Sequence, residues 1–164
     1  MKKENQGFTV IELLIVFAIV GILMLGVTMS FSSLMKSNVN QVSKTIDGEM
    51  KKLRIVTLSK DKAYSLFIYK RGSYYYYQFA ADDTPYNELV DGNKLGRKDL
   101  EIQYRIKGSE DFKCLEGSDF VRIAYNASNG KYSNDRVYDQ IRFVSNSRQK
   151  QIVIANVTGR HFIR

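Results

Sequence analysis

Residues 7–31 constrain this chain most, because they form an apolar run that begins directly after a short, polar and basic leader. From Phe8 onward the run is broken by one charge, Glu12. As a helix rising about 1.5 Å per residue, it is long enough to cross a hydrocarbon layer of roughly 30 Å. The sequence therefore predicts a membrane-spanning helix over residues 8–31.

The carboxylate of Glu12 lies near the start of this predicted helix, where a charge costs roughly 2.5–3.5 kcal/mol unless it is paired. We therefore expect a cationic partner for Glu12. No small-residue cleavage site of the secretory kind follows the run, and cleavage ahead of it would keep the anchor. Lys2 and Lys3 precede the run, which predicts a cytoplasmic leader and an extracytoplasmic chain after about residue 31.

The octapeptide GFTVIELL at residues 7–14 resembles the type III signal of type IV prepilins and pseudopilins. In that family a membrane peptidase cuts after the glycine and N-methylates the new first residue. The resemblance implies cleavage between Gly7 and Phe8 and methylation of Phe8. It also implies that Glu12 pairs with the terminal amine of a neighbouring subunit during filament assembly. Its expected partners are prepilin peptidase, other pilin or pseudopilin subunits and the cytoplasmic (inner) membrane.

The chain has 164 residues, so about 130 remain for a soluble part once the leader and span are set aside, enough for one small domain. The net charge of +8 falls to +7 without the leader, which carries Lys2, Lys3 and Glu4. A basic balance favours acidic partners such as nucleic acid, anionic lipid or wall polymers, without defining a site. The one cysteine, Cys114, excludes an intramolecular disulfide, and we expect it to be a half-buried packing residue.

Helical spacing continues beyond the apolar run to about residue 58. The apolar residues that carry it are Leu34, Val39, Val42, Ile46, Met50 and Leu53. The predicted organisation is a leader at 1–7, a spanning and assembly helix at 8–31, an amphipathic continuation at 32–58 and an extracytoplasmic β-rich domain at 59–164.

From residue 63 the period changes to two, which is typical of strands. Residues 64–69 and 74–79 predict a hairpin, and residues 100–106 predict a half-buried strand. Further strands are expected at 120–125, 140–145, 151–157 and 160–163. The fold class is therefore α+β and pilin-like, with a long N-terminal helix followed by a mostly antiparallel sheet.

Two segments allow more than one role. The run Tyr74 to Tyr77 fits strand packing, and stacking on sugars or bases is the alternative. Residues 80–99 contain the one proline and predict an exposed loop. Asp82, Asp83 and Asp91 in this loop match no calcium-binding spacing, which favours a solvated loop.

The C-terminal segment Thr158-Gly159-Arg160 resembles the end of GspH/FimT-like minor pseudopilins, some of which bind DNA through C-terminal arginines in natural transformation. This chain departs from that pattern, because Phe162 replaces the second arginine and Arg164 follows. In a strand, Arg160 and Arg164 would share a face about 13 Å apart. Residues 136–164 hold six basic side chains against Asp139 alone, a net +5. The candidate DNA-binding residues are Arg142, Arg148, Lys150, Arg160 and Arg164.

The sequence does not predict an enzyme. The single histidine, His161, has no cysteine or carboxylate at ligand-like spacing, and we expect no cofactor or metal site. The function favoured is a minor pilin or pseudopilin of a type IV pilus or a type II secretion-like filament. Two alternatives stay open: a DNA-binding minor pilin of a competence system, and a single-span surface protein that does not assemble.

Overall fold

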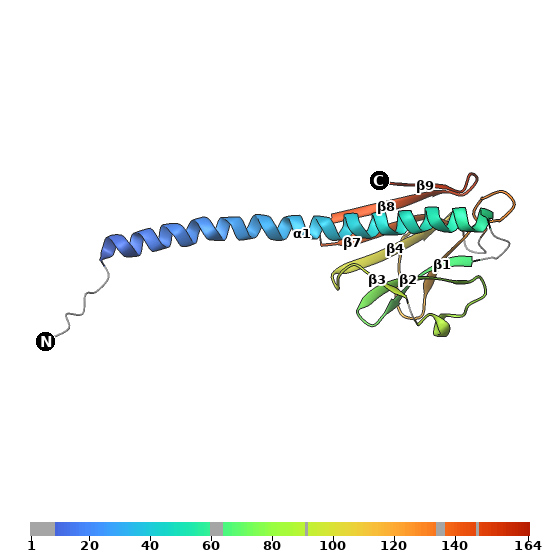
Figure 1. Cartoon of the computed structure of the whole chain (residues 1–164), viewed down its shortest axis with the longest axis horizontal. Helices are drawn as coiled ribbons and strands as arrows, with labels where there is room; N and C mark the ends of the chain where they lie inside the picture. Colours follow the sequence, from blue (N-terminus) through green and yellow to red (C-terminus); the bar gives the residue numbers. More distant parts are fainter. Residues whose placement is uncertain (1–8, 60–63, 91, 134–136, 147) are drawn as a thin grey trace. The chain divides into compact units, whose positions relative to one another are not determined.

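The computed structural model describes residues 9–59, 64–90, 92–133, 137–146 and 148–164, with side chains described for all of these except 25–37. The chain divides into two compact units, Met1–Met35 and Lys36–Arg164, and each is described by itself. The helix α1 (Val10–Ser59) begins in the first unit and ends in the second (Figure 1). The predicted helix to about residue 58 is confirmed.

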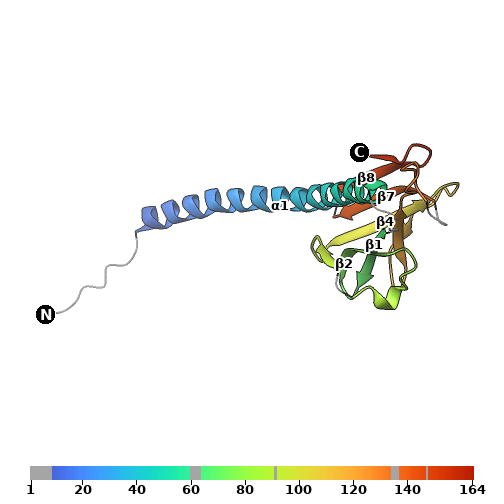
Figure 2. The same cartoon turned by 45° about the vertical axis from the view of Figure 1, so that its right-hand side comes forward.

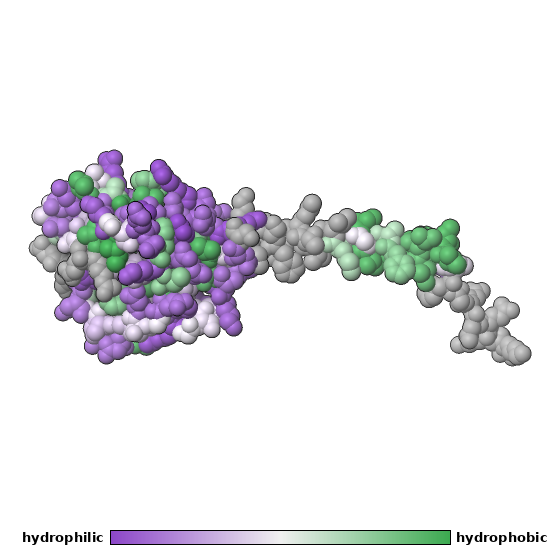
Figure 3. Space-filling model, turned by 180° about the vertical axis from the view of Figure 1, so that it is seen from behind, coloured by the Kyte–Doolittle hydropathy of each residue, from purple (hydrophilic) through white to green (hydrophobic). Residues whose placement is uncertain are grey.

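In the first unit, the large apolar side chains of α1 from Val10 to Met24 are 40–82% exposed. Figure 3 shows this stretch as an almost continuous hydrophobic surface. No helix in the described part of the chain has the length and apolar character needed to cross a membrane. The predicted span includes residue 8 and the side chains of 25–31, which lie outside the described residues. The span therefore stays a prediction.

In the second unit, α1 buries one face. Its members, each at most 2% exposed, are Val39, Val42, Ile46, Met50 and Leu53. Their spacing of three or four residues places them on one side of the helix, as the sequence predicts. Burying such a side chain stabilises the fold by about 1.5–3 kcal/mol. The helix is therefore a central part of the domain core.

The first sheet has four antiparallel strands in the order β3-β2-β1-β6. They are β1 (Tyr64–Arg71), β2 (Tyr74–Ala81), β3 (Asn93–Leu95) and β6 (Phe120–Ala124). The β1–β2 hairpin pairs Tyr64 with Ala81 at one end and Arg71 with Tyr74 at the turn. The predicted hairpin is thus confirmed.

The second sheet has five antiparallel strands in the order β5-β4-β7-β8-β9. They are β4 (Leu100–Ile106), β5 (Lys113–Cys114), β7 (Tyr138–Ser145), β8 (Arg148–Ala155) and β9 (Arg160–Ile163). The sequence missed β5, and it placed the fourth of these strands at 151–157 instead of 148–155. The polar start of β8 explains that error, because Arg148, Gln149 and Lys150 hide the strand period.

Both sheets pack on the buried face of α1 in the second unit, as Figures 1 and 2 show. The four-stranded sheet contributes Leu66 and Ile68 to this core, and the five-stranded sheet contributes Ile102, Ile141 and Phe143. The other face of the five-stranded sheet, called the outer face below, points away from this core by strand alternation.

The predicted exposed loop at 80–99 is a partial error. Residues 82–90, called the covering segment, contain the short 3-10 helix η1 (Tyr86–Glu88), and β3 follows and pairs with β2. Leu89 is fully buried against Phe67 and Tyr69 in a second, smaller core. These two aromatic residues alternate along β1 with Leu66 and Ile68, so β1 is buried on both faces. The covering segment shields Phe67 and Tyr69 from water, and this burial of apolar surface stabilises its conformation.

Candidate functional site

Thr9 and Glu12 form a reciprocal cap at the start of α1. The backbone N–H and the hydroxyl of Thr9 both donate to Glu12 Oε2, each at 2.9 Å. The backbone N–H of Glu12 donates to Thr9 Oγ1 at 3.4 Å. This is a capping box, in which a threonine precedes the helix and a glutamate three residues later reaches back. The cap sets Val10 as the first helical residue.

The capping box gives Glu12 partners within its own chain, because the carboxylate accepts from two neutral donors of Thr9. The cationic partner that the sequence predicts for Glu12 would belong to a neighbouring subunit, and it stays a prediction. The T-x-x-E spacing was visible in the sequence and could have predicted this cap. Gly7 and Phe8 lie outside the described residues, so the cleavage site stays a prediction.

The outer face of the five-stranded sheet collects three of the five candidate DNA-binding residues. Arg142 on β7 pairs with Gln151 on β8, whose backbone exchanges hydrogen bonds with Arg164. Arg160 pairs with Ala155, four residues further along β8, and therefore lies on the same face. Arg160 and Arg164 are exposed. The structure thus brings Arg142, Arg160 and Arg164 to one surface.

Arg148 and Lys150 do not join that surface. They pair with Ser145 and Phe143, which are buried on the helix-facing side of the sheet. Strand alternation gives paired residues the same face, so both basic residues lie on the side opposite to Arg142. The net charge of the C-terminal segment alone could not show this division, which depends on the register of β7 and β8.

Aromatic and acidic side chains hold two arginines in place on the outer face. The guanidinium of Arg142 lies 3.6 Å from the ring centroid of Phe112. Arg105 makes a two-point contact with Asp139, at 3.0 and 2.8 Å, and this hydrogen bonding raises the pKa of the guanidinium. Because Phe112 covers one face of Arg142, the two C-terminal arginines are the more accessible charges.

His161 joins β9 to α1 through a buried polar cluster. Its Nε2 lies 3.3 Å from both the carbonyl oxygen and Oδ1 of Asp47. Its Nδ1 lies 3.3 Å from the hydroxyl of Tyr132 and 3.4 Å from that of Tyr125, and these hydroxyls are 2.9 Å apart. Burial lowers the pKa of His161 and raises that of Tyr125 to about 12. Burial therefore favours the neutral forms of His161 and Tyr125, and the contacts of His161 fasten the C-terminal strand to the helix.

The turn between β8 and β9 explains the Thr158-Gly159 pair. The N–H groups of both residues donate to the carbonyl of Ala155, at 3.1 and 3.0 Å. Arg54 on α1 donates to the carbonyl of Thr158 at 3.4 Å. Gly159 is buried against Gly130, where a Cβ atom would lie 2.0 Å from the Gly130 carbonyl oxygen. The glycine of this motif therefore has a packing role.

Cys114 is exposed, so the prediction of a half-buried packing residue is wrong. It lies in β5, a two-residue strand at the edge of the sheet, where little can cover it. Its thiol donates to Glu101 Oε1 at 3.2 Å, and this hydrogen bond is the main reason that the pKa of the thiol is raised.

The tyrosine run does not form a single stacking row. Tyr75 is buried in the main core, whereas Tyr76 packs on the smaller core on the opposite side of β2. Tyr74 makes a cation–π contact with Lys94, whose Nζ lies 3.2 Å from the ring centroid. In the described residues, no three potential metal ligands cluster, and Asp91 lies outside them.

The geometry thus defines an α+β chain with a capped, apolar N-terminal helix and a two-sheet domain. Residues 2–28 match the prokaryotic N-terminal methylation motif, a type IV prepilin-like signal. This match supports the pilin family and indicates a type IV pilin-like or pseudopilin-like precursor. The family that carries this motif is structural and non-enzymatic. It implies processing by a peptidase, assembly with other pilins and membrane anchoring. Comparison with curated proteins and with solved structures gave no match.

Proposed function

We propose that the chain is a minor pilin or pseudopilin subunit of a type IV pilus or a type II secretion-like filament. Prepilin peptidase cleaves it between Gly7 and Phe8 and methylates Phe8, and the subunit assembles through its N-terminal helix. The observation that carries this proposal is the methylation motif over residues 2–28. The helix start at Val10 supports it, because the capped helix begins just after the proposed cleavage site.

The same proposal includes a membrane anchor at residues 8–31, with the β-rich domain outside the cytoplasm. The exposed apolar side chains from Val10 to Met24 favour burial in lipid or between helices of a filament. Lys2 and Lys3 favour a cytoplasmic leader. The ending Thr158-Gly159-Arg160 favours the GspH/FimT-like branch of the family.

Processing is tested by intact-mass measurement of the protein from membranes that contain an active prepilin peptidase. The mass should correspond to a chain that starts at methylated Phe8, and Gly7→Arg should block cleavage, because a large side chain cannot occupy the site before the cut. Membranes with a catalytically inactive peptidase provide the control. Retention of Met1 in the wild-type protein with the active enzyme would refute the proposal.

Filament entry is tested at Glu12, where capping and intersubunit pairing can be separated. Glu12→Gln keeps an acceptor for the capping box, since glutamine also serves at this position. The variant loses the charge that pairs with a neighbouring terminal amine. We expect normal processing and at least a tenfold loss from sheared filaments, equivalent to about 1.4 kcal/mol per contact. Wild-type incorporation of Glu12→Gln would exclude a charge-pairing role.

A second candidate function is DNA binding by the basic tail, which the shared outer face of Arg142, Arg160 and Arg164 favours. Contacts to phosphates give a slope of about −0.9 per contact in log affinity against log salt on duplex DNA. Three contacts predict a slope of about −3 and a dissociation constant of roughly 10⁻⁴–10⁻⁶ M.

The test is a salt titration of the full chain in detergent with labelled duplex DNA. Arg160→Gln with Arg164→Gln should flatten the slope by about two units. Arg148→Gln with Lys150→Gln removes the same charge from the opposite face and is the matched control. Equal slopes for the two double variants would show that the outer face is not a DNA site.

A further inference from the structure

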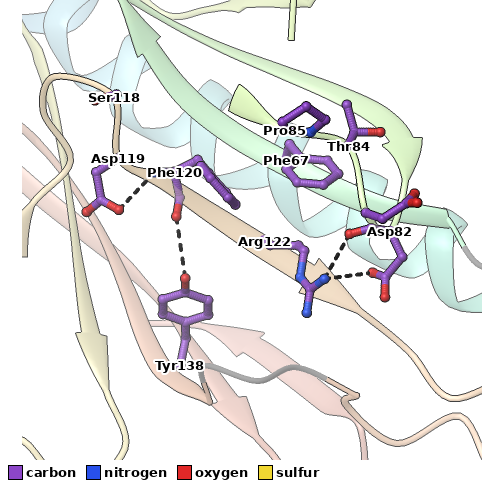
Figure 4. A pocket seen from close by; sticks show the side chains of 10 residues that line it. Phe67, Asp82, Thr84, Pro85, Ser118, Asp119, Phe120, Arg122 and Tyr138 are labelled. Carbon is purple, nitrogen blue, oxygen red and sulfur yellow. Dashed lines mark hydrogen bonds and ion pairs between the residues drawn. The ribbon is translucent and has the colours of Figure 1, made fainter. Parts of the chain in front are cut away.

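A pocket of about 470 Å³ opens where the covering segment meets β6 (Figure 4). Phe67 and Phe120 form its aromatic floor, with ring centroids 5.5 Å apart. They come from the neighbouring strands β1 and β6. Thr84 and Pro85 of the covering segment form one wall. The two rings are tilted by 52° to each other, and Phe67 is fully buried, so Phe120 is the ring that a ligand can reach. The pocket has a size common among small-molecule sites.

Polar groups surround this floor. At one end, Arg122 Nη1 donates to the carbonyl oxygen of Asp82 at 2.8 Å and lies 3.4 Å from its Oδ1. The hydroxyl of Ser65 also donates to that Oδ1. These contacts fix the carboxylate and the guanidinium at this end.

At the other end, Asp119 accepts hydrogen bonds at both carboxylate oxygens. The Tyr104 hydroxyl donates to Oδ2, and the backbone N–H of Phe120 donates to Oδ1 at 3.0 Å. The Tyr138 hydroxyl donates to the carbonyl of Phe120 at 3.4 Å. Groups held by their neighbours in this way are ordered before a ligand arrives, which reduces the entropy cost of binding.

We propose that this pocket binds a pyranose-sized sugar. A pyranose ring has an apolar C–H face, which packs on an aromatic ring, and hydroxyl groups around its edge. The floor at Phe120 supplies the ring, and Asp82 and Asp119 supply acceptors at opposite ends. A carboxylate accepts hydrogen bonds at about four lone-pair sites, and hydroxyl groups are suitable donors to it. Arg122 supplies N–H groups that can donate hydrogen bonds to the sugar hydroxyl groups.

An anionic ligand fits the pocket poorly, because the lining holds the carboxylates of Asp82, Asp83 and Asp119 against the guanidinium of Arg122. Arg122 compensates Asp82 at one end, and the hydrogen bonds to Asp119 stabilise its charge at the other. A cation is the competing class of ligand, and it would meet the guanidinium of Arg122. A neutral ligand with many hydroxyl groups satisfies both kinds of polar group. The proposal does not depend on filament assembly.

The test uses the full chain in detergent micelles and saturation-transfer NMR with the methyl glycosides of glucose, galactose and N-acetylglucosamine. We expect saturable binding of at least one glycoside. Thr84→Val replaces a half-buried wall hydroxyl with a methyl group and should weaken binding by about threefold to tenfold. Phe120→Leu removes the aromatic floor and should weaken it by about tenfold.

Phe112→Leu is the matched control for Phe120→Leu, because Phe112 stacks on Arg142, away from the pocket. It should bind the glycoside as the parent does. Thr84→Val keeps the test informative if Phe120→Leu does not fold. The proposal is overturned if no glycoside binds saturably, if arginine amide binds and the glycosides do not, or if both pocket variants bind as well as the parent.

Discussion

Replacing Gly159 with alanine should destabilise the domain far more than the same change at a comparable glycine. Gly159 has φ +63°, and a Cβ atom there would lie 2.0 Å from the Gly130 carbonyl oxygen. Gly117 has a similar φ of +60°, and a Cβ atom added there would meet no atom within 4 Å beyond its two chain neighbours. Comparing Gly159→Ala with Gly117→Ala therefore separates the cost of a left-handed backbone from the cost of the clash with Gly130.

The expected magnitudes follow from these two terms. The left-handed conformation costs a non-glycine residue roughly 1–2 kcal/mol, which is the whole cost expected for Gly117→Ala. At Gly159 the turn or the Gly130 carbonyl must also move by more than 1 Å to reach an ordinary contact, and overpacking of this kind costs about 1–3 kcal/mol more. We therefore expect a loss of about 2–5 kcal/mol for Gly159→Ala.

Urea unfolding of the full chain in detergent, followed by tyrosine fluorescence, measures both variants. The chain has 11 tyrosines and no tryptophan, and all the tyrosines lie beyond residue 35, so the signal reports on the second unit. Free energies come from linear extrapolation to water. If the two variants differ by less than about 0.5 kcal/mol, within the range of a featureless surface change, the packing argument for Gly159 fails.

Two further predictions concern the buried cluster and the covering segment. Acidification from about pH 7.5 to about pH 5.5 should lower the free energy of unfolding, because burial lowers the pKa of His161 and the unfolded chain takes up its proton first, near pH 6.5. This stabilisation is present above the unfolded pKa and is lost as pH falls through the folded pKa; unfolding at several pH values measures it. Leu89→Ala should cost about 2–5 kcal/mol in the same urea assay, because this residue of the covering segment is fully buried against Phe67 and Tyr69.

Each of these predictions has a control in the chain. His161→Gln removes the titrating ring and should flatten the pH dependence, whereas an unchanged slope would assign it to other groups. The charged neighbours to consider are Asp47, Lys51 and Arg54. Val90→Ala is the neighbouring control for Leu89→Ala, since Val90 is 55% exposed. Equal effects at the two positions would show that the covering segment is not packed.

The sequence predicted the fold where a single period dominates. The buried face of α1 and the β1–β2 hairpin follow from spacings of three or four residues and of two. The period of β8 was harder to see, because its first residues are all polar. The covering segment was missed because its order depends on Phe67 and Tyr69, which are distant in sequence and fit the pattern of a half-buried strand equally well.

Some features of the candidate sites can be predicted from the sequence, and others depend on the tertiary structure. The capping partner of Glu12 is local, three residues away, and could be predicted from the sequence alone. The separation of Arg148 and Lys150 from Arg142 depends on strand register, which charge counting does not contain. The pocket at Phe120 combines side chains from β1, β6 and the covering segment, so only the tertiary structure brings them together.

The contact between Cys114 and Glu101 affects how readily the thiol reacts with oxidants. The thiolate attacks disulfides and peroxides, whereas the protonated thiol reacts far more slowly. Because Glu101 accepts a hydrogen bond from the thiol and raises its pKa, less thiolate forms at neutral pH than at an ordinary surface cysteine. One carboxylate thus slows thiol–disulfide exchange at this surface cysteine.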